Sequence, residues 1–577
     1  MAGEEARVED DRARQERGHK RRDDQPRTYH VIYHSVSKHV DIKRTAIVLH
    51  RWLGVALCLL FLLWFMSGIG MMYWDFPSVT AADRLERSPR LRASAVAIDP
   101  AQAFAALGGS KPASAIRLDS FDGRPVYRFR IGRDDSLVYA DTGEPQRMVS
   151  REMVDRIASA WTGRPASEAH VEAMLNADQW TVQGPLRTLR PLWKFSWPDG
   201  EQAYVAQTSG EVVQYTTSQS RLGAYLGPIP HWLYFTPLRV RQQAWSRVVI
   251  WTSGLGTVAT LLGMIVGVWM YSPSKRYRLA GAPARLPYRG YKRWHAIIGL
   301  IFGVTAGTWA YSGMLSMDPF GDPGRPEPLR LRSSNVQLAA FAAKSPRAAL
   351  EQLGSLDVRQ LELATFDGDA VYLATLAGGS SRVVPVSGDP QPEFDRGRIE
   401  AVVRKATAAL GTADMAVADR YDRYYLDRRG ERPLPVLVAR LSDANRTRYY
   451  INPKTAQVVG SYSTRAWTTR WLYHGLHSLD FPWLYNHRPA WDIVVIALML
   501  AGAALSVTSI VLAWRVVRSR LHPDDGHRQF ERVPGGDAHL QHARGSGQVD
   551  QQREVRRRER DQVHVHGGLK NGDMADG

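Results

Sequence analysis

One apolar stretch occurs twice in the chain. Residues 50–68 read HRWLGVALCLLFLLWFMSG, and residues 295–313 read HAIIGLIFGVTAGTWAYSG. Each copy starts with a histidine and ends with Ser-Gly. A shift of 245 positions superposes His50 on His295, Gly54 on Gly299, Trp64 on Trp309, Ser67 on Ser312 and Gly68 on Gly313. The repeat restricts the fold to one that can carry two copies of a long apolar helix, each with a histidine in its first turn.

Four segments are long, apolar and almost free of charge, namely residues 47–73, 248–271, 296–316 and 493–514. At ~1.5 Å per residue, each is long enough to cross a hydrocarbon layer of ~30 Å. The mean hydropathy of −0.31 hides them because the rest of the chain is polar. The first segment follows a polar tail of more than 40 residues, which argues against a cleavable signal peptide. We therefore predict four transmembrane helices.

The net charge of +18 is concentrated beside these segments. Lysines and arginines cluster at residues 14–27, 275–293 and 515–520. The positive-inside rule then places the N-terminus, the middle loop and the C-terminus in the cytoplasm. We expect no nucleic-acid partner, and we assign the RRRER run at 556–560 to a solvated tail. The single cysteine, Cys58, excludes an intrachain disulfide.

The two soluble regions match each other at the same offset. Phe121-Asp122-Gly123 falls on Phe366-Asp367-Gly368. A constant offset across membrane and soluble parts indicates a tandem duplication of one unit of two spans and one domain. Helical spacing followed by alternating strands predicts two small α+β modules in each domain. The predicted division is a tail (1–44), helix (45–74), domain (75–230), histidine segment and helix (231–272), loop (273–293), helix (294–317), domain (318–476), histidine segment and helix (477–515) and disordered tail (516–577).

A second pair of segments precedes the outgoing spans. Residues 230–245 (PHWLYFTPLRVRQQAW) align with 476–491 (LHSLDFPWLYNHRPAW) at an offset of 246. This places His231 on His477, each about fifteen residues before its span. His474 lies three residues before His477, on the same helical face if that stretch is helical. We rank His474 second, as a replacement for His477 or a support for it.

Four histidines thus form two matched pairs, His50 with His295 and His231 with His477. If the repeats pack about a pseudo-twofold axis, the members of each pair face one another across it. Two facing imidazoles can be the axial ligands of one haem iron, so two haems are expected, one near each membrane face. A histidine at a helix end also commonly serves only in interfacial hydrogen bonding. Ionisable groups within a helix bundle are nevertheless functional candidates.

The same residues carry a family resemblance. Leu49-His50-Arg51-Trp52-Leu53-Gly54 resembles the opening motif of the PepSY-associated transmembrane-helix proteins of bacterial inner membranes. Residues 204–213 (YVAQTSGEVV) and 450–459 (YINPKTAQVV) resemble the ends of PepSY modules. The family includes ferric-siderophore reductases that hold b-type haems between four helices. The resemblance carries over His50 and His477, whereas His295 and His231 follow from the internal repeat. Lys292-Arg293-Trp294-His295 reverses the order of the motif.

These observations predict a membrane α-helical fold with four transmembrane helices from a tandem duplication and two periplasmic α+β PepSY-like domains. The predicted protein passes electrons from a cytoplasmic or quinone donor, through two b haems, to a ferric siderophore or chelate. No acid or base residue is required, so none is assigned. The alternative is a haem-free scaffold whose domains bind or regulate a periplasmic protein. An electron-transfer subunit that serves a partner other than iron is a third possibility.

Overall fold

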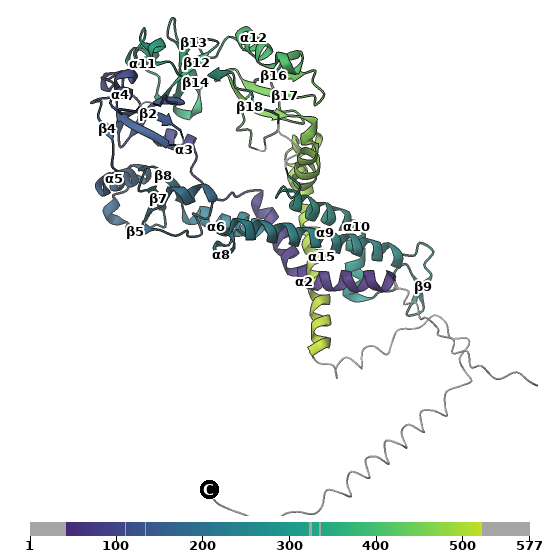
Figure 1. Cartoon of the computed structure of the whole chain (residues 1–577). Coiled ribbons are helices and arrows are strands. Elements are labelled where there is room, and N and C mark those ends of the chain that lie inside the picture. The colour runs from purple at the N-terminus through teal and green to yellow at the C-terminus, as the bar shows by residue number, and fades with distance from the viewer. Residues whose placement is uncertain are drawn as a thin grey trace, which may run out of the picture.

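The computed structural model describes residues 42–521, except positions 110, 133, 322–325, 334–335 and 428. The predicted cytoplasmic tail 1–44 and the predicted disordered tail 516–577 therefore lie mostly outside the described residues. Figure 1 shows the arrangement of the described part, with the sheets at one end of a helix bundle.

Four helices in the described part of the chain are long and apolar enough to cross a membrane. They are α2 (Ile42–Met71), α9 (Gln242–Met270), α10 (Gly290–Leu315) and α15 (Ala490–Leu521). Helices α2 and α10 each pack against both α9 and α15. The bundle interior is aromatic: the ring centres of Phe65 and Phe302 are 5.7 Å apart, and those of Phe65 and Trp309 are 6.1 Å apart. The chain is thus a multi-pass membrane protein, as predicted.

The last span is longer than its apolar run. Helix α15 continues to Leu521, beyond the predicted start of the disordered tail at 516. Two of its arginines lie over aromatic rings of neighbouring helices, Arg515 at 5.4 Å from the centre of Tyr291 and Arg520 at 6.0 Å from that of Trp52. Cation–π contacts and the apolar stems of these side chains stabilise extra helical turns at a membrane surface. The polarity of the segment hid this extension.

The soluble part repeats a helix-then-strands pattern. The first half of the chain contains α3 (Ala81–Arg87), α4 (Pro100–Ala105), β1 (Ala115–Phe121), β2 (Arg124–Ile131), β3 (Asp134–Tyr139), β4 (Pro145–Gln146), α5 (Arg151–Thr162), β5 (His170–Met174), β6 (Leu192–Ser196), β7 (Gln202–Ala206), β8 (Val212–Thr216) and α6 (Ser218–Leu226). The second half contains β11 (Arg332–Ser333), α11 (Pro346–Leu353), β12 (Val358–Phe366), β13 (Asp369–Leu376), β14 (Ser381–Pro385), α12 (Arg396–Thr407), β15 (Ala413–Ala418), β16 (Val436–Leu441), β17 (Arg448–Asn452) and β18 (Gln457–Tyr462).

The two soluble regions share one sheet. Strands β1 and β12 pair antiparallel and join an eight-stranded sheet with the order β14-β13-β12-β1-β2-β3-β4, in which β11 also pairs with β12. Arg117 lies directly opposite Glu362, its equivalent at the 245-residue offset. Antiparallel pairing of equivalent positions has local twofold symmetry. One hydrophobic core, which includes Leu118 and Leu361, lies on this sheet and draws on both halves. The sequence analysis did not anticipate this union.

The remaining modules differ between the halves. Strands β5–β8 and β15–β18 each form a four-stranded antiparallel sheet in sequence order. In the second half, Leu373 of the shared sheet and Ile451 of the small sheet belong to a single core. In the first half, Val126 and Phe195 belong to two separate cores. The buried core of the first half is therefore interrupted between its two modules, where the partly buried Val149 and Ile157 pack against both clusters.

A short hairpin joins the middle helices. Strands β9 (Tyr277–Leu279) and β10 (Ala282–Ala284) pair antiparallel between α9 and α10. The hairpin lies at the end of the bundle away from the large sheet (Figure 1). The two ends of the bundle differ in charge, because the connection at the hairpin end is rich in Lys and Arg.

The shared core predicts a stability effect. Leu118 is fully buried opposite Leu361, so Leu118→Ala leaves a cavity and should cost about 2–5 kcal/mol of unfolding free energy. Met148→Ala is the control because Met148 is 82% exposed, and its change should stay within about 0.5 kcal/mol. The thermal unfolding midpoint of the detergent-solubilised protein measures both. Equal midpoints for the two variants would contradict a common core.

Candidate functional site

The predicted histidines lie at the two ends of the helix bundle. His50 on α2 and His295 on α10 form the hairpin-side pair, close to the β9–β10 connection. His231 on α7 (Pro228–Trp232) and His477 on α13 (Leu476–Ser478) form the sheet-side pair. The centres of the imidazole rings are 6.1 Å apart in the hairpin-side pair and 6.0 Å apart in the sheet-side pair. The structure thus brings together both pairs that the repeat predicted.

Local backbone geometry turns the sheet-side histidines toward each other. Leu233 and Leu479 end their short helices in the left-handed conformation, with φ of 53° and 50°. The indole of Trp245 donates a hydrogen bond to the carbonyl of Trp232 at 2.7 Å, and the indole of Trp491 donates to that of Ser478 at 3.1 Å. Each outgoing span therefore holds the residue that follows its histidine.

Helix α2 approaches this turn closely. A Cβ atom at Gly70 would lie 2.4 Å from the carbonyl oxygen of Leu226, at the junction of α6 and α7. Only glycine permits that distance. The approach brings the imidazole of His231 against α2, where it is half-buried and lies beside the Trp64 carbonyl.

Hydrogen bonds fix the tautomer of the sheet-side pair. The Nδ1 of His231 lies 3.2 Å from the Trp64 carbonyl and 3.3 Å from the Ser67 hydroxyl. The Nδ1 of His477 lies 3.0 Å from the Ser312 hydroxyl. Both serine hydroxyls donate their own protons to helix carbonyls, at 2.6 Å and 3.1 Å. In that arrangement the hydroxyls accept from the imidazole, which is consistent with a proton on Nδ1.

The hairpin-side pair follows the same rule. The Nδ1 of His50 lies 2.9 Å from the carbonyl of Ala259. The Nδ1 of His295 lies 3.2 Å from the Thr508 hydroxyl and 3.3 Å from the Ser509 hydroxyl, and both hydroxyls donate to the carbonyl of Leu505. Each Nδ1–H again faces an acceptor. All four Nε2 atoms consequently keep a lone pair.

This arrangement fits an iron held between two imidazoles. A histidine nitrogen lies ~2.0 Å from a bound transition metal and the ring centre about 1.1 Å further, so two rings on opposite sides of one ion are about 6 Å apart. Both pairs show that separation. A hydrogen bond from the second ring nitrogen to a carbonyl or hydroxyl commonly orients metal-bound histidine. The residues present therefore fit two bis-histidine haem sites.

Burial keeps the sheet-side pair neutral. Removal from water lowers the pKa of His231 to about 4 and that of His477 to about 3, with a further decrease at His477 from its neighbour His231. An uncharged imidazole is the form that binds a metal. Both Nε2 lone pairs are thus available at neutral pH.

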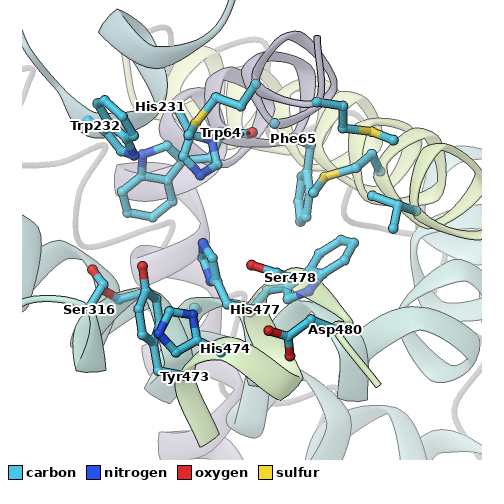
Figure 2. A pocket seen from close by; sticks show the side chains of 18 of the residues that line it. Trp64, Phe65, His231, Trp232, Ser316, Tyr473, His474, His477, Ser478 and Asp480 are labelled. Atoms are coloured by element: carbon cyan, nitrogen blue, oxygen red, sulfur yellow. Dashed lines mark hydrogen bonds between the residues drawn. The ribbon is translucent and has the colours of Figure 1, made fainter. Parts of the chain in front are cut away.

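The sheet-side pair opens into a cavity of about 470 Å³. Figure 2 shows the two imidazoles facing each other with Trp64, Phe65 and Trp232 around them. Trp309 also lines the cavity, and its indole N–H has no partner among the described residues. The volume and the mostly apolar lining, with nine Phe, Trp and Tyr side chains, are typical of sites for a flat organic cofactor.

His474 lies in the same cavity but outside the pair. Its ring lies beside that of Tyr473, with centres 4.6 Å apart and the ring planes tilted by 43°, whereas the ring opposite His231 is that of His477. Burial lowers the pKa of His474, and the Asp480 carboxylate opposes this shift. Arg470 donates a hydrogen bond of 2.8 Å to that carboxylate. His474 therefore belongs to a polar group at the side of the site.

The hydrogen-bond acceptors of the histidines were not among the predicted site residues. The repeat had already matched Ser67 with Ser312 and Trp64 with Trp309, yet nothing in one sequence assigned them a role. Thr508 and Ser509 are polar residues inside an apolar span, which is the signal that would have pointed to them. Their partner residues lie more than 150 positions away, so only the fold connects them.

The comparison with known proteins agrees with the membrane architecture. No curated protein matches the chain. A family model described as the PepSY-associated TM region matches residues 47–360, which is more than half of the chain and includes three of the four spans and both members of the hairpin-side pair. The chain therefore belongs to the PepSY-associated transmembrane family.

Proposed function

We propose that this protein carries electrons across a bacterial inner membrane through two b-type haems. Electrons would enter on the cytoplasmic side, from a cytoplasmic or quinone donor, and leave on the periplasmic side. The acceptor would be ferric iron in a siderophore or another chelate. Haem b bound at each histidine pair would supply an iron that changes its charge by one electron.

The observation that carries this proposal is the common geometry of the two histidine pairs, one at each end of the bundle. In every case Nδ1 faces an oxygen acceptor, and in both pairs the ring centres are about 6 Å apart. Simple interfacial hydrogen bonding would leave no reason for two imidazoles from distant segments to lie so close together at each end of the bundle. His50 and His295 would hold one haem, and His231 and His477 the other.

We further propose that the fold arose by tandem duplication and that the sheets are periplasmic. The twofold pairing of Arg117 with Glu362 supports the duplication, because equivalent residues meet. The basic β9–β10 connection supports a cytoplasmic position for the hairpin end of the bundle. The hairpin-side pair would then be the cytoplasmic haem site, and the sheet-side pair the periplasmic one.

The bundle supplies a dry, aromatic space between the two sites. His50 and Trp64, whose carbonyl accepts from His231, are fourteen positions apart on α2, which corresponds to about 21 Å along the helix. Phe302 lies within this interval and Phe65 and Trp309 lie at its sheet-side end, and each is at least 94% buried. They exclude water and ions, so the membrane would remain closed to protons while electrons cross.

The periplasmic site would be approached through the polar side of its cavity. Arg432, Asp427, His474 and Asp480 line that side, whereas the interior is apolar. An acceptor would need only to come close to an exposed cofactor edge there. Accordingly, these residues would position an acceptor and would not act as acid or base.

Histidine variants test the assignment of the sheet-side pair. His231→Ala or His477→Ala should lower the haem content from about two to about one per chain, because one axial ligand is lost. Ferric-chelate reduction should fall with it. His474→Ala is the matched control, since it lines the same cavity and should keep both haems. Haem content and the reduced-minus-oxidised visible spectrum of the purified protein measure these changes.

The same measurement separates the proposal from its alternative. A folded, haem-free protein, even after expression with added haem precursor, would contradict electron transfer and favour a scaffold whose soluble domains bind a periplasmic protein. Full activity in His231→Ala would refute the role of the sheet-side pair alone.

A glycine variant tests the hairpin-side pair without removing a ligand. A Cβ atom at Gly263 would lie 2.5 Å from Cε1 of His50, so Gly263→Ala should displace that ring and remove about one haem per chain. Gly54→Ala is the control because nothing lies within 4 Å of its Cβ position. If both variants retain two haems, His50 is not an axial ligand.

A further inference from the structure

A second cavity, of about 320 Å³, lies in the gap between the two modules of the first half. The large sheet forms one wall, and α5 with the start of β8 forms another. Its lining contains six arginines and four carboxylates, an excess of two positive charges. The arginines are Arg84, Arg87, Arg117, Arg128, Arg130 and Arg156. We call this cavity the arginine cleft.

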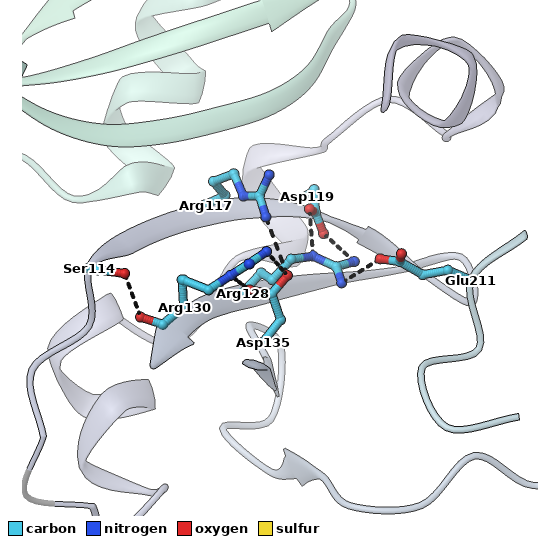
Figure 3. Close-up of polar contacts among 7 residues, drawn as sticks. All are labelled: Ser114, Arg117, Asp119, Arg128, Arg130, Asp135 and Glu211. Atoms are coloured by element: carbon cyan, nitrogen blue, oxygen red, sulfur yellow. Dashed lines mark hydrogen bonds and ion pairs between the residues drawn. The ribbon is translucent and has the colours of Figure 1, made fainter. Parts of the chain in front are cut away.

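Arg128 is the fixed base of the arginine cleft. Its side chain is 9% exposed and donates hydrogen bonds of 3.0 Å and 3.4 Å to Asp119 and one of 2.8 Å to Glu211. Figure 3 shows this guanidinium between the two carboxylates. Glu211 directly precedes β8, so the contact also joins the two modules. The positive charge of Arg128 is therefore held in a fixed position and balanced by Asp119 and Glu211.

The other arginines leave positive charge uncompensated. Arg117 and Arg130 share a single carboxylate, that of Asp135 (Figure 3). Glu362, which lies opposite Arg117 in the sheet, is paired instead with Arg332 at 3.1 Å. A guanidinium carries five N–H donors, and Arg117 uses one of them in the described structure, at 3.4 Å. Most of its donors are thus free for a ligand.

Arg87 and Arg84 extend this excess. Arg87 lies over the ring of Trp161 at 4.6 Å and donates to its backbone carbonyl, but has no carboxylate partner within the described ranges. Arg84 also lines the cleft, and within the described ranges it likewise has no carboxylate partner. The indole N–H of Trp161 and the hydroxyl of Ser120 are buried there without hydrogen-bond partners in the described part of the chain. Both are neutral donors that a ligand can satisfy.

The second half of the chain shows that the fold does not require this cleft. At the 245-residue offset, Asp119 corresponds to Ala364 and Arg128 to Leu373. Ala364 and Leu373 both belong to the continuous core of the second half. The second half therefore places hydrophobic residues at the positions that are charged in the first half. The charged version in the first half costs desolvation and offers no packing, which is typical of a binding site.

We propose that the arginine cleft binds a small anion with two or three carboxylate groups, either free or as its ferric chelate. Guanidinium groups bind carboxylates in a bidentate manner, and several of them around one cavity select for several carboxylates on one ligand. The excess of two positive charges matches such an anion. This binding site goes beyond the proposed electron transfer and does not depend on the haem assignment.

Calorimetric titration of the full-length protein in detergent tests the proposal, with citrate, ferric citrate and inorganic phosphate as probes. Arg117→Gln should weaken citrate binding about tenfold or more, the effect of one lost charge-assisted contact. Arg84→Gln should do the same and leaves no carboxylate unpaired, so it keeps the fold. Arg398→Gln is the matched control, because Arg398 pairs with Asp367 and Asp369 on the equivalent turn of the second half.

Each outcome decides the matter. Tighter binding of citrate or of ferric citrate than of phosphate supports the cleft, and the tighter of the two identifies the source of the carboxylates. Absence of citrate binding, equal affinity for phosphate, or an equal loss in Arg398→Gln would overturn it. Haem content, measured on every variant, should not change, so failure of the cleft and failure of the haem proposal are distinguishable.

Discussion

The antiparallel pairing of β1 with β12 is the constraint on which the architecture depends. It joins equivalent positions, Arg117 and Glu362, and so relates the two halves by a local twofold axis. The helices that enter and leave each half inherit this relation. The histidines of equivalent helices meet in pairs for the same reason, at one end of the bundle beside the sheets and at the other beside the hairpin.

Within that frame, each histidine depends on an acceptor supplied by a helix that lies far away in sequence. Carbonyls of Ala259 and Trp64 and hydroxyls such as those of Ser312 and Thr508 all face Nδ1. Because each Nδ1 lies beside an oxygen acceptor, the helix packing favours the tautomer with the proton on Nδ1. The geometry required for metal binding is thus part of the helix packing, and no flexible side chain has to rearrange.

The sequence predicted the parts of this structure that repeat. The spans followed from the length of four apolar segments, the module pattern from helical spacing and alternating strands, and the pairing of His50 with His295 from the 245-residue offset. The shared sheet did not, because β-pairing between distant strands leaves no periodic signal in one sequence. Neither did the arginine cleft, since Asp119 and Arg128 alternate along strands as surface residues do. These polar positions differ between the two halves, so comparison of the two copies does not single them out.

The shared sheet also says something about a single half. A chain that carried only one copy would expose β1 as an open edge, with unpaired backbone groups and half of a hydrophobic core. Two such chains would complete each other through the same strand, residue 117 of one beside residue 117 of the other. The contact would be isologous, and each histidine would find its partner in the second subunit. The two halves of this chain are thus related as the subunits of such a dimer would be, and one half carries charged residues where the other has hydrophobic core.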